Sequence, residues 1–476
     1  MADFCSTGGS RKGGYDLAVI GAGSAGFSAA ITAAEQGANV ALIGHGLIGG
    51  TCVNVGCVPS KTMIRAAEAL HGARAASRFP GLTGEAHVTD WRALIAAKDD
   101  LVGTLRQKKY VDLLPEYNGI AYLEGTARLN GAGVLVNDSP VAAGKIIVAT
   151  GASPAMPGIP GIENVPYLTS TTALELDQSP RSLLVIGGGY IGCELAQMFA
   201  RTGTAVTMVT RSRLLPEAEP EIAQELARYL ADEGIMVRTG LTYSRIEGRD
   251  GGIALTIDVD GSKETLTASQ VLVTTGRTPN TADLGLEESG VKLAPGGAIV
   301  VDDRMRTSKP GIYAAGDVTG RDQFVYMAAY GAKLAARNVL NGDSLIYDNA
   351  AMPWVVFTDP QVAGVGLSKR QARQRGFDVK TSVVPLDQVP RALAARDTRG
   401  LIKLVADRNT GRVLGAQILA PEGADSIQTM VLAIKFGMTT KELGETIFPY
   451  LTTVEGLKLA AQGFDKDVTK LSCCAG

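Results

Sequence analysis

The sequence has few cysteines, few histidines and almost no imbalance of charge. Six cysteines in 476 residues are too few for the disulfide framework of a secreted protein, and sparse thiols in a reducing compartment are better interpreted as reactive. The formal net charge of -2 leaves no basic surface for nucleic acid and gives no support for steering of acidic substrates. The three histidines, His45, His71 and His87, show no metal-ligand spacing.

Long apolar runs are also missing. Residues 1–14 contain no apolar core of signal-peptide length, and no later run approaches the roughly 20 residues of a membrane span. We therefore expect a cytoplasmic protein without stable membrane association. A hydrophobic content of 45% and a charged content of 20% are typical of a globular protein, and the length predicts about two to four domains.

The segment 49–61, GGTCVNVGCVPSK, places Cys52 and Cys57 five residues apart. On an ideal helix this separation is ~7.5 Å along the axis, beyond the ~6.8 Å Cα limit for a disulfide. Closing a bridge requires an interrupted helix, for which Gly56 and Pro59 are suited. Because so small a ring contributes only about 2 kcal/mol through chain entropy, we interpret the pair as a redox-active dithiol rather than a structural staple. A zinc half-site and two unrelated buried thiols are the alternatives.

A dinucleotide-binding motif lies near the start of the chain. The apolar run 15–20 predicts a buried parallel strand, and GAGSAG with an Ala-rich helix follows it. In this motif Gly21 forms the turn, Gly23 lets a pyrophosphate approach, and Gly26 permits close helix packing. After the second strand, Gly44 stands where an acidic ribose ligand is expected, so that contact is unassigned.

The glycine motif occurs a second time. The run 181–186 predicts another buried strand, and Gly187, Gly189 and Gly192 follow it with the same spacing at the start of another helix. Two such units are far more specific than one. They predict an α/β fold with two Rossmann-like dinucleotide-binding domains.

The residues after the next strand, 205–209, indicate which nucleotide the second unit binds. No carboxylate is present there to hold a free 2′-hydroxyl, whereas Arg211 and Arg213 offer guanidinium groups for a 2′-phosphate. NADPH is therefore favoured over NADH. A solvated turn is the alternative interpretation of the two arginines.

The dithiol motif resembles that of the flavin disulfide reductase family, and the resemblance extends over residues 15–464. It makes Cys52 the interchange thiol and Cys57 the thiol nearest the flavin. It also implies FAD and NADPH as cofactors and a homodimer whose subunits share active sites. The domains it implies are an FAD-binding domain in two segments, 1–151 and 276–346, an NADPH-binding domain, 152–275, and a C-terminal α+β dimerisation domain, 347–476.

The same resemblance assigns further residues to the site. Lys61 and Glu194 look like the ion pair beneath the flavin, with a surface salt bridge as the alternative. Tyr190 corresponds to the aromatic residue that covers the flavin until nicotinamide displaces it. Asp317 corresponds to the acceptor for the ribityl chain, and a simple helix N-cap is the plainer interpretation, compatible with that role. Thr51, Lys61 and Gly151 are assigned to FAD, and Gly276 to NADPH.

One position departs from the members that exchange disulfides. They carry a His-Pro near the C-terminus, where this sequence has Tyr450 and Leu451. A phenol with an unperturbed pKa of about 10 is poorly suited to shuttle protons near neutrality. Disulfide substrates are therefore disfavoured.

The chain ends with a second thiol pair, Cys473 and Cys474. Thiolates select soft metals, so this pair and the dithiol suggest a metal ion passed between sites. Together with Tyr450, the two pairs resemble the mercury-reducing branch of the family. That resemblance implies that Hg(II) arrives as thiol complexes, is held by Cys52, Cys57, Cys473 and Cys474, and is reduced to Hg(0). An NADPH-dependent disulfide reductase for a small thiol and a flavoprotein that sequesters soft metals are the alternatives.

Overall fold

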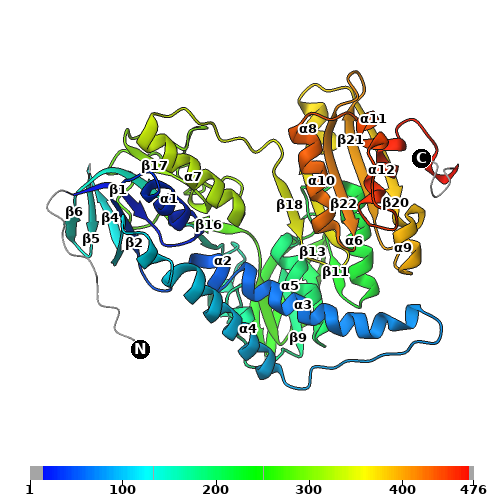
Figure 1. Cartoon of the computed structure of the whole chain (residues 1–476). Helices are drawn as coiled ribbons and strands as arrows, with labels where there is room; N and C mark the ends of the chain where they lie inside the picture. The colour runs from blue at the N-terminus through cyan, green and yellow to red at the C-terminus, as the bar shows by residue number, and fades with distance from the viewer. Residues whose placement is uncertain (1–13, 132, 250, 471–476) are drawn as a thin grey trace. The chain divides into compact units, whose positions relative to one another are not determined.

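The computed structural model describes residues 14–470 except 132 and 250 (Figure 1). The chain packs into two compact units. Unit 1 holds the chain up to Ser60, Ala93–Ala155 and Gly276–Asp348, and unit 2 holds Lys61–Arg92, Met156–Thr275 and the chain from Asn349. Parallel sheets in both units confirm the expected α/β class. The three domain boundaries expected from the sequence, after residues 151, 275 and 346, stay a prediction.

Unit 1 is built on a parallel sheet whose strands run in the order β17-β7-β1-β2-β3. The β1 residues Leu17–Ile20 are buried on both faces, which explains their uninterrupted apolar sequence. Helices α1 and α7 pack against each other beside this sheet (Figure 1). The strands are β1 (Tyr15–Ile20), β2 (Val40–Gly44), β3 (Ile120–Glu124), β7 (Ala143–Val148) and β17 (Ile312–Ala314), and the helices α1 (Ser24–Ala34) and α7 (Val325–Asn341).

Short elements complete unit 1 and its connections. β4 (Ala127–Asn130), β5 (Gly133–Val136) and β6 (Ser139–Val141) form an antiparallel sheet, and β8 (Ala152–Pro154) pairs with β16 (Arg277–Pro279). The helices are α2 (Gly50–Asn54), α3 (Cys57–Arg74) and α4 (Trp91–Arg106). α4 ends at Arg106, and a π-helical turn, Gln107–Val111, follows it.

The first part of unit 2 repeats this plan on a smaller scale. Its parallel sheet has the order β11-β10-β9-β15, and α5 packs on it. The elements are β9 (Ser182–Ile186), α5 (Tyr190–Arg201), β10 (Ala205–Val209), α6 (Pro220–Asp232), β11 (Met236–Arg238) and β15 (Gln270–Val273). An antiparallel sheet of β12 (Thr242–Arg249), β13 (Gly252–Val259) and β14 (Ser262–Ala268) shares its apolar core.

The last part of unit 2 is an antiparallel sheet in the order β18-β19-β22-β21-β20, with β18 at one edge. Its strands are β18 (Pro353–Val356), β19 (Gln361–Gly366), β20 (Val379–Pro385), β21 (Leu401–Asp407) and β22 (Val413–Ala420). The helices are α8 (Lys369–Gln374), α9 (Pro390–Ala394), α10 (Gly423–Lys435), α11 (Thr440–Glu445) and α12 (Glu455–Gln462). None of the helices in the described ranges is long and apolar enough to cross a membrane.

Candidate functional site

In unit 1, three glycines shape the loop between β1 and α1. Gly21 has φ +118°, and a Cβ there would lie 2.2 Å from the Ala149 carbonyl oxygen. A Cβ on Gly26 would lie 1.7 Å from the Gly21 carbonyl oxygen, so α1 can approach only because this residue is glycine. Gly23 caps α1 without a side-chain hydrogen bond, which leaves the first-turn amides available to an anion. The loop therefore fits a dinucleotide pyrophosphate.

The cysteine segment begins against this loop. Gly49 forms a parallel bridge with Gly23, and a Cβ on Gly50 would lie 2.6 Å from the Gly23 Cα. Cys52 lies in α2, and Cys57 is the first residue of α3. Both cysteines are half-buried. The helix is interrupted between them, as their spacing requires for a disulfide.

Asp317 lies beside a residue that the sequence analysis did not single out. The Asp317 Oδ2 atom is 3.6 Å from the Arg277 Nε atom. Burial raises the pKa of the Asp317 carboxyl, and Arg277 partly opposes this shift. Arg277 Nε is buried without a hydrogen-bond partner in the described chain, so it retains a donor for a bound polar group. The N-cap interpretation is wrong, because Gly316 occupies the cap position of this turn.

The remaining positions expected in unit 1 are small or exposed. Thr51 is exposed on α2. Gly151 and Gly276 have φ values of +74° and +113°, and no atom lies within 4 Å of a Cβ placed on either. A Cβ on Gly44 would lie 2.5 Å from the Ala22 Cβ, so no acidic side chain fits there in this backbone.

In unit 2, the loop between β9 and α5 has the same construction as the first loop. Gly187 again has φ +118°, and a Cβ on Gly192 would lie 2.2 Å from its carbonyl oxygen. Gly189 caps α5 without a side-chain hydrogen bond, and the space around its Cβ position is open to 4 Å. Tyr190 begins the helix, and burial raises the pKa of its phenol to about 12. The second loop therefore also fits a pyrophosphate.

The two arginines after β10 differ in their contacts. Arg213 Nη2 donates hydrogen bonds to the carbonyl oxygens of Pro216 and Ala218, at 2.7 and 2.6 Å. Arg211 is exposed and acts electrostatically on Tyr243. The geometry therefore gives Arg213 a role in holding its own loop and leaves Arg211 accessible to a phosphate.

Lys61 and Glu194 form an ion pair, with 2.7 Å between Lys61 Nζ and Glu194 Oε2. Glu194 is only 5% exposed, so the alternative of a surface salt bridge is wrong. The backbone N–H of Phe357 donates to Glu194 Oε1 at 2.9 Å, and the Lys61 ammonium lies 4.9 Å from the centre of the Phe357 ring. α3 carries both Cys57 and Lys61, one helical turn apart. No sequence motif pointed to Phe357.

The other cysteines and Tyr450 lie in different surroundings. Cys193 is fully buried, and burial raises the pKa of its thiol. Tyr450 is 49% exposed, in the loop before α12. Cys473 and Cys474 lie outside the described residues. Within the described ranges, no three His, Cys, Asp or Glu side chains form a group that could hold a metal ion.

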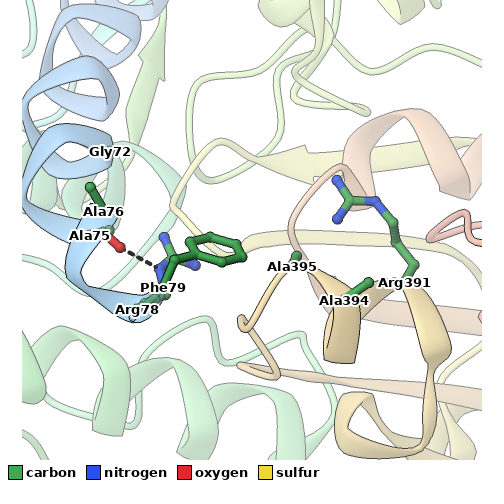
Figure 2. Close-up of a pocket in the computed structure, with 8 residues that line it drawn as sticks. All are labelled: Gly72, Ala75, Ala76, Arg78, Phe79, Arg391, Ala394 and Ala395. Carbon is green, nitrogen blue, oxygen red and sulfur yellow. Dashed lines mark hydrogen bonds between the residues drawn. The ribbon is translucent and has the colours of Figure 1, made fainter. Parts of the chain in front are cut away.

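A hollow of about 470 Å³ lies in unit 2, between the end of α3 with the turn that follows it and helix α9. Figure 2 shows the residues that line it. Arg78 and Arg391 line it, and each already pairs with a carboxylate. Arg78 Nη1 lies 2.6 Å from Asp397 Oδ2, and Arg391 Nη2 lies 3.3 Å from Glu422 Oε1. No residue expected at the site lines this hollow, so it is not part of the candidate site. The candidate groups are the first glycine loop and the dithiol in unit 1 and, described by themselves, the second glycine loop and the Lys61 pair in unit 2.

Comparison with family models gives two matches. The model described as pyridine nucleotide-disulphide oxidoreductase matches residues 15–336, and that of the family's dimerisation domain matches residues 352–461. The two matches together span most of the chain.

Individual proteins are similar over nearly the whole length. A mercuric reductase of Lysinibacillus sphaericus is 48% identical, over 97% of this chain and 85% of its own. A mercuric reductase of Streptomyces lividans is 48% identical, over 97% of this chain and 99% of its own. Among solved structures, the HOCl-induced flavoprotein disulfide reductase RclA of Escherichia coli has a TM-score of 0.82 at 32% identity, over 94% of this chain and 99% of its own. A Cu(II) complex of that protein matches with a TM-score of 0.83 at 31% identity, over the same shares of each chain.

Proposed function

Because the chain belongs to the pyridine nucleotide-disulphide oxidoreductase family, and to its mercuric reductases, we propose that it reduces Hg(II) to elemental mercury with electrons from NADPH. The observation that carries the reaction type is the position of the dithiol segment, whose Gly49 and Gly50 contact the first nucleotide loop at Gly23. The choice of Hg(II) is supported by the names of the relatives. The overall reaction converts a bis-thiolate complex of Hg(II), NADPH and a proton into Hg(0), NADP+ and two free thiols.

The dithiol binds the substrate in this proposal. Each thiolate, Cys52 and Cys57, displaces one small-thiol ligand from Hg(II) by associative exchange, so that the ion is held by two sulfurs. When bound, FAD would accept a hydride from NADPH and supply two electrons to the ion on the dithiol. Lys61 contributes a positive charge one turn beyond Cys57, and Glu194 fixes its position.

The residues that would hold the nucleotides are those of the two loops. For FAD we propose the loop glycines Gly21, Gly23 and Gly26 together with Thr51, Lys61, Gly151 and Asp317. For NADPH we propose Gly187, Gly189, Gly192, Arg211, Arg213 and Gly276. The open space at Gly189 and the exposed guanidinium of Arg211 support the NADPH assignment.

The match to a dimerisation domain supports a homodimer. Ile447 and Phe436 in the segment after β22 are 94% and 74% exposed in the single chain, which is unusual for large apolar side chains unless a partner covers them. We place Tyr450, Cys473 and Cys474 of one subunit at the dithiol of the other, where the tail would pass Hg(II) to Cys52 and Cys57.

The decisive assay follows NADPH oxidation by the flavin-loaded dimer. We expect oxidation to start when Hg(II) is added with excess small thiol, and to stay at background with a small disulfide or with Cu(II). Oxidation with the disulfide but not with Hg(II) would make the protein a disulfide reductase. Binding of Hg(II) without NADPH oxidation would make it a protein that sequesters soft metals.

A further inference from the structure

Tyr190, which the family resemblance makes the residue that covers the flavin until nicotinamide displaces it (the gate residue), stacks on the indole of Trp354. The two ring centroids lie 5.6 Å apart, and the ring planes are inclined by 20°. Tyr190 begins α5, whereas Trp354 lies on β18 more than 160 residues later, and both side chains are half-buried within unit 2. An offset stack of this kind is attractive beyond the area that it buries.

The neighbouring strand provides the space for this indole. Trp354 on β18 pairs directly with Gly364 on β19. A Cβ on Gly364 would lie 2.4 Å from Trp354 Cζ2, although the backbone there is not in the left-handed region. Glycine at this position is therefore explained by the space the indole requires. The indole therefore packs over β19 as well as against Tyr190.

The same short segment also contacts the next turn of α5. The Phe357 N–H, just after β18, donates to Glu194, which lies one helical turn after Tyr190. Figure 1 shows β18 beside α5, and the two elements pack together. Residues 354–357 therefore contact two of the side chains expected at the site, Tyr190 and Glu194.

We propose that Trp354 is a positioning residue, which holds Tyr190 in the observed orientation and opposes its displacement by the nicotinamide ring. The inference rests on the proposed function and on the role that the family resemblance implies for Tyr190, which moves aside when the nicotinamide of NADPH binds. The Tyr190–Trp354 stack is then lost in the nucleotide complex. Because the free energy of this stack must be given up on binding, the stack weakens the affinity for the nucleotide. Trp354 would set how tightly this enzyme binds NADPH, without touching the nucleotide.

The chain provides its own reporter for this motion. Trp354 and Trp91 are its two tryptophans. Trp91 is 9% exposed, stacks with Phe199 and donates its indole N–H to the Leu176 carbonyl oxygen. In the flavin-loaded Trp91→Phe variant, the remaining tryptophan emission comes from Trp354 alone.

The experiment titrates this variant with NADP+ and measures binding independently by calorimetry. We expect the Trp354 emission to change along the calorimetric binding curve, and the change to disappear in the Trp91→Phe, Tyr190→Ala double variant. If NADP+ binds while Trp354 emission stays constant, the gate contact is overturned and the proposed function stands. If NADP+ does not bind to the flavin-loaded protein, both the inference about Trp354 and the proposed function are overturned.

Two variants of similar side-chain volume separate stacking from packing. Trp354→Leu removes the aromatic ring and should lower the dissociation constant for NADP+ roughly two- to tenfold, the range expected for loss of one aromatic stack. Trp354→Phe keeps a ring and should stay close to the native value. Equal dissociation constants for the Leu and Phe variants would contradict a role through stacking.

Discussion

Arg211 and Arg213 lie two residues apart but differ in what they contact. Arg211 is exposed, whereas Arg213 donates to two carbonyl oxygens of its own loop. We expect Arg211→Ala to weaken NADPH binding by on the order of 1.5–3 kcal/mol, roughly tenfold or more, and to leave NADH binding unchanged. Arg213→Ala is the matched comparison for Arg211→Ala. Because Arg213 holds its own loop, its removal should in addition lower the thermal stability of the protein. Dissociation constants for both nucleotides test this, and equal losses for NADPH and NADH in Arg211→Ala would show that Arg211 does not bind the 2′-phosphate.

The two thiols of the dithiol should be distinguishable by spectroscopy. Cys57 is the first residue of α3, and we propose it as the thiol nearest the flavin, with Cys52 as the exchanging thiol. After two-electron reduction we expect a long-wavelength charge-transfer absorbance that Cys52→Ala keeps and Cys57→Ala loses. The opposite result in the two variants would reverse the assignment.

At the scale of elements, the second glycine loop separates a folding requirement from a binding requirement. A Cβ on Gly192 would meet the Gly187 carbonyl oxygen at 2.2 Å, whereas one on Gly189 would meet nothing within 4 Å. Gly192→Ala should therefore lower the free energy of unfolding by about 1–3 kcal/mol, the usual cost of overpacking. Gly189→Ala should leave stability almost unchanged and weaken NADPH binding, because the added methyl group occupies the approach of the pyrophosphate. Denaturant unfolding and nucleotide titration of both variants test these expectations. A Gly192→Ala protein with the same free energy of unfolding as the native chain would contradict the packing argument.

The elements that could be predicted from the sequence are those with a local signal. β1 and β10 coincide with the expected strands because each is a short apolar run beside a turn or glycine motif. The contact of Phe357 with Glu194 could not be predicted, since it joins residues 163 positions apart through the packing of an edge strand on a helix. The roles of Arg211 and Arg213 could not be separated from sequence either, because only the folded loop brings carbonyl oxygens to Arg213. Arg277 follows Gly276, which the resemblance assigned to NADPH, but its closeness to Asp317 depends on where β16 begins and β17 ends.

At the scale of the whole molecule, one charge network joins several segments of unit 2. Nη2 of Arg201, on α5, lies 2.6 Å from Glu233 Oε1 and 3.0 Å from Asp359 Oδ2. Nη2 of Arg399 lies 3.1 Å from Asp359 Oδ1. The charges of all four residues act on the pKa of His71, which lies on α3. The network therefore connects α3, α5, the end of α6 and the loops after β18 and before β21.

This network predicts a pH dependence of stability. Burial, followed by the charge of Arg201, lowers the pKa of His71, so the unfolded chain binds the proton more readily than the folded one. Stability should therefore be full above the unfolded pKa of about 6.5 and decrease as the pH falls below it toward the lower folded pKa. His71→Gln should remove this part of the dependence. Urea unfolding of both proteins at about pH 7.5 and pH 5.5 tests the prediction, and parallel losses would assign the effect to other groups.

In the proposed reaction, electrons from NADPH reach Hg(II) through Cys52 and Cys57. This route is tested by trapping mercury vapour from the flavin-loaded dimer while NADPH oxidation is followed in the same vessel, with Hg(II) supplied in excess small thiol. We expect equimolar release of Hg(0) and consumption of NADPH, and loss of both in Cys52→Ala and Cys57→Ala. Consumption of NADPH without mercury vapour, or undiminished vapour from the Cys57→Ala protein, would contradict it.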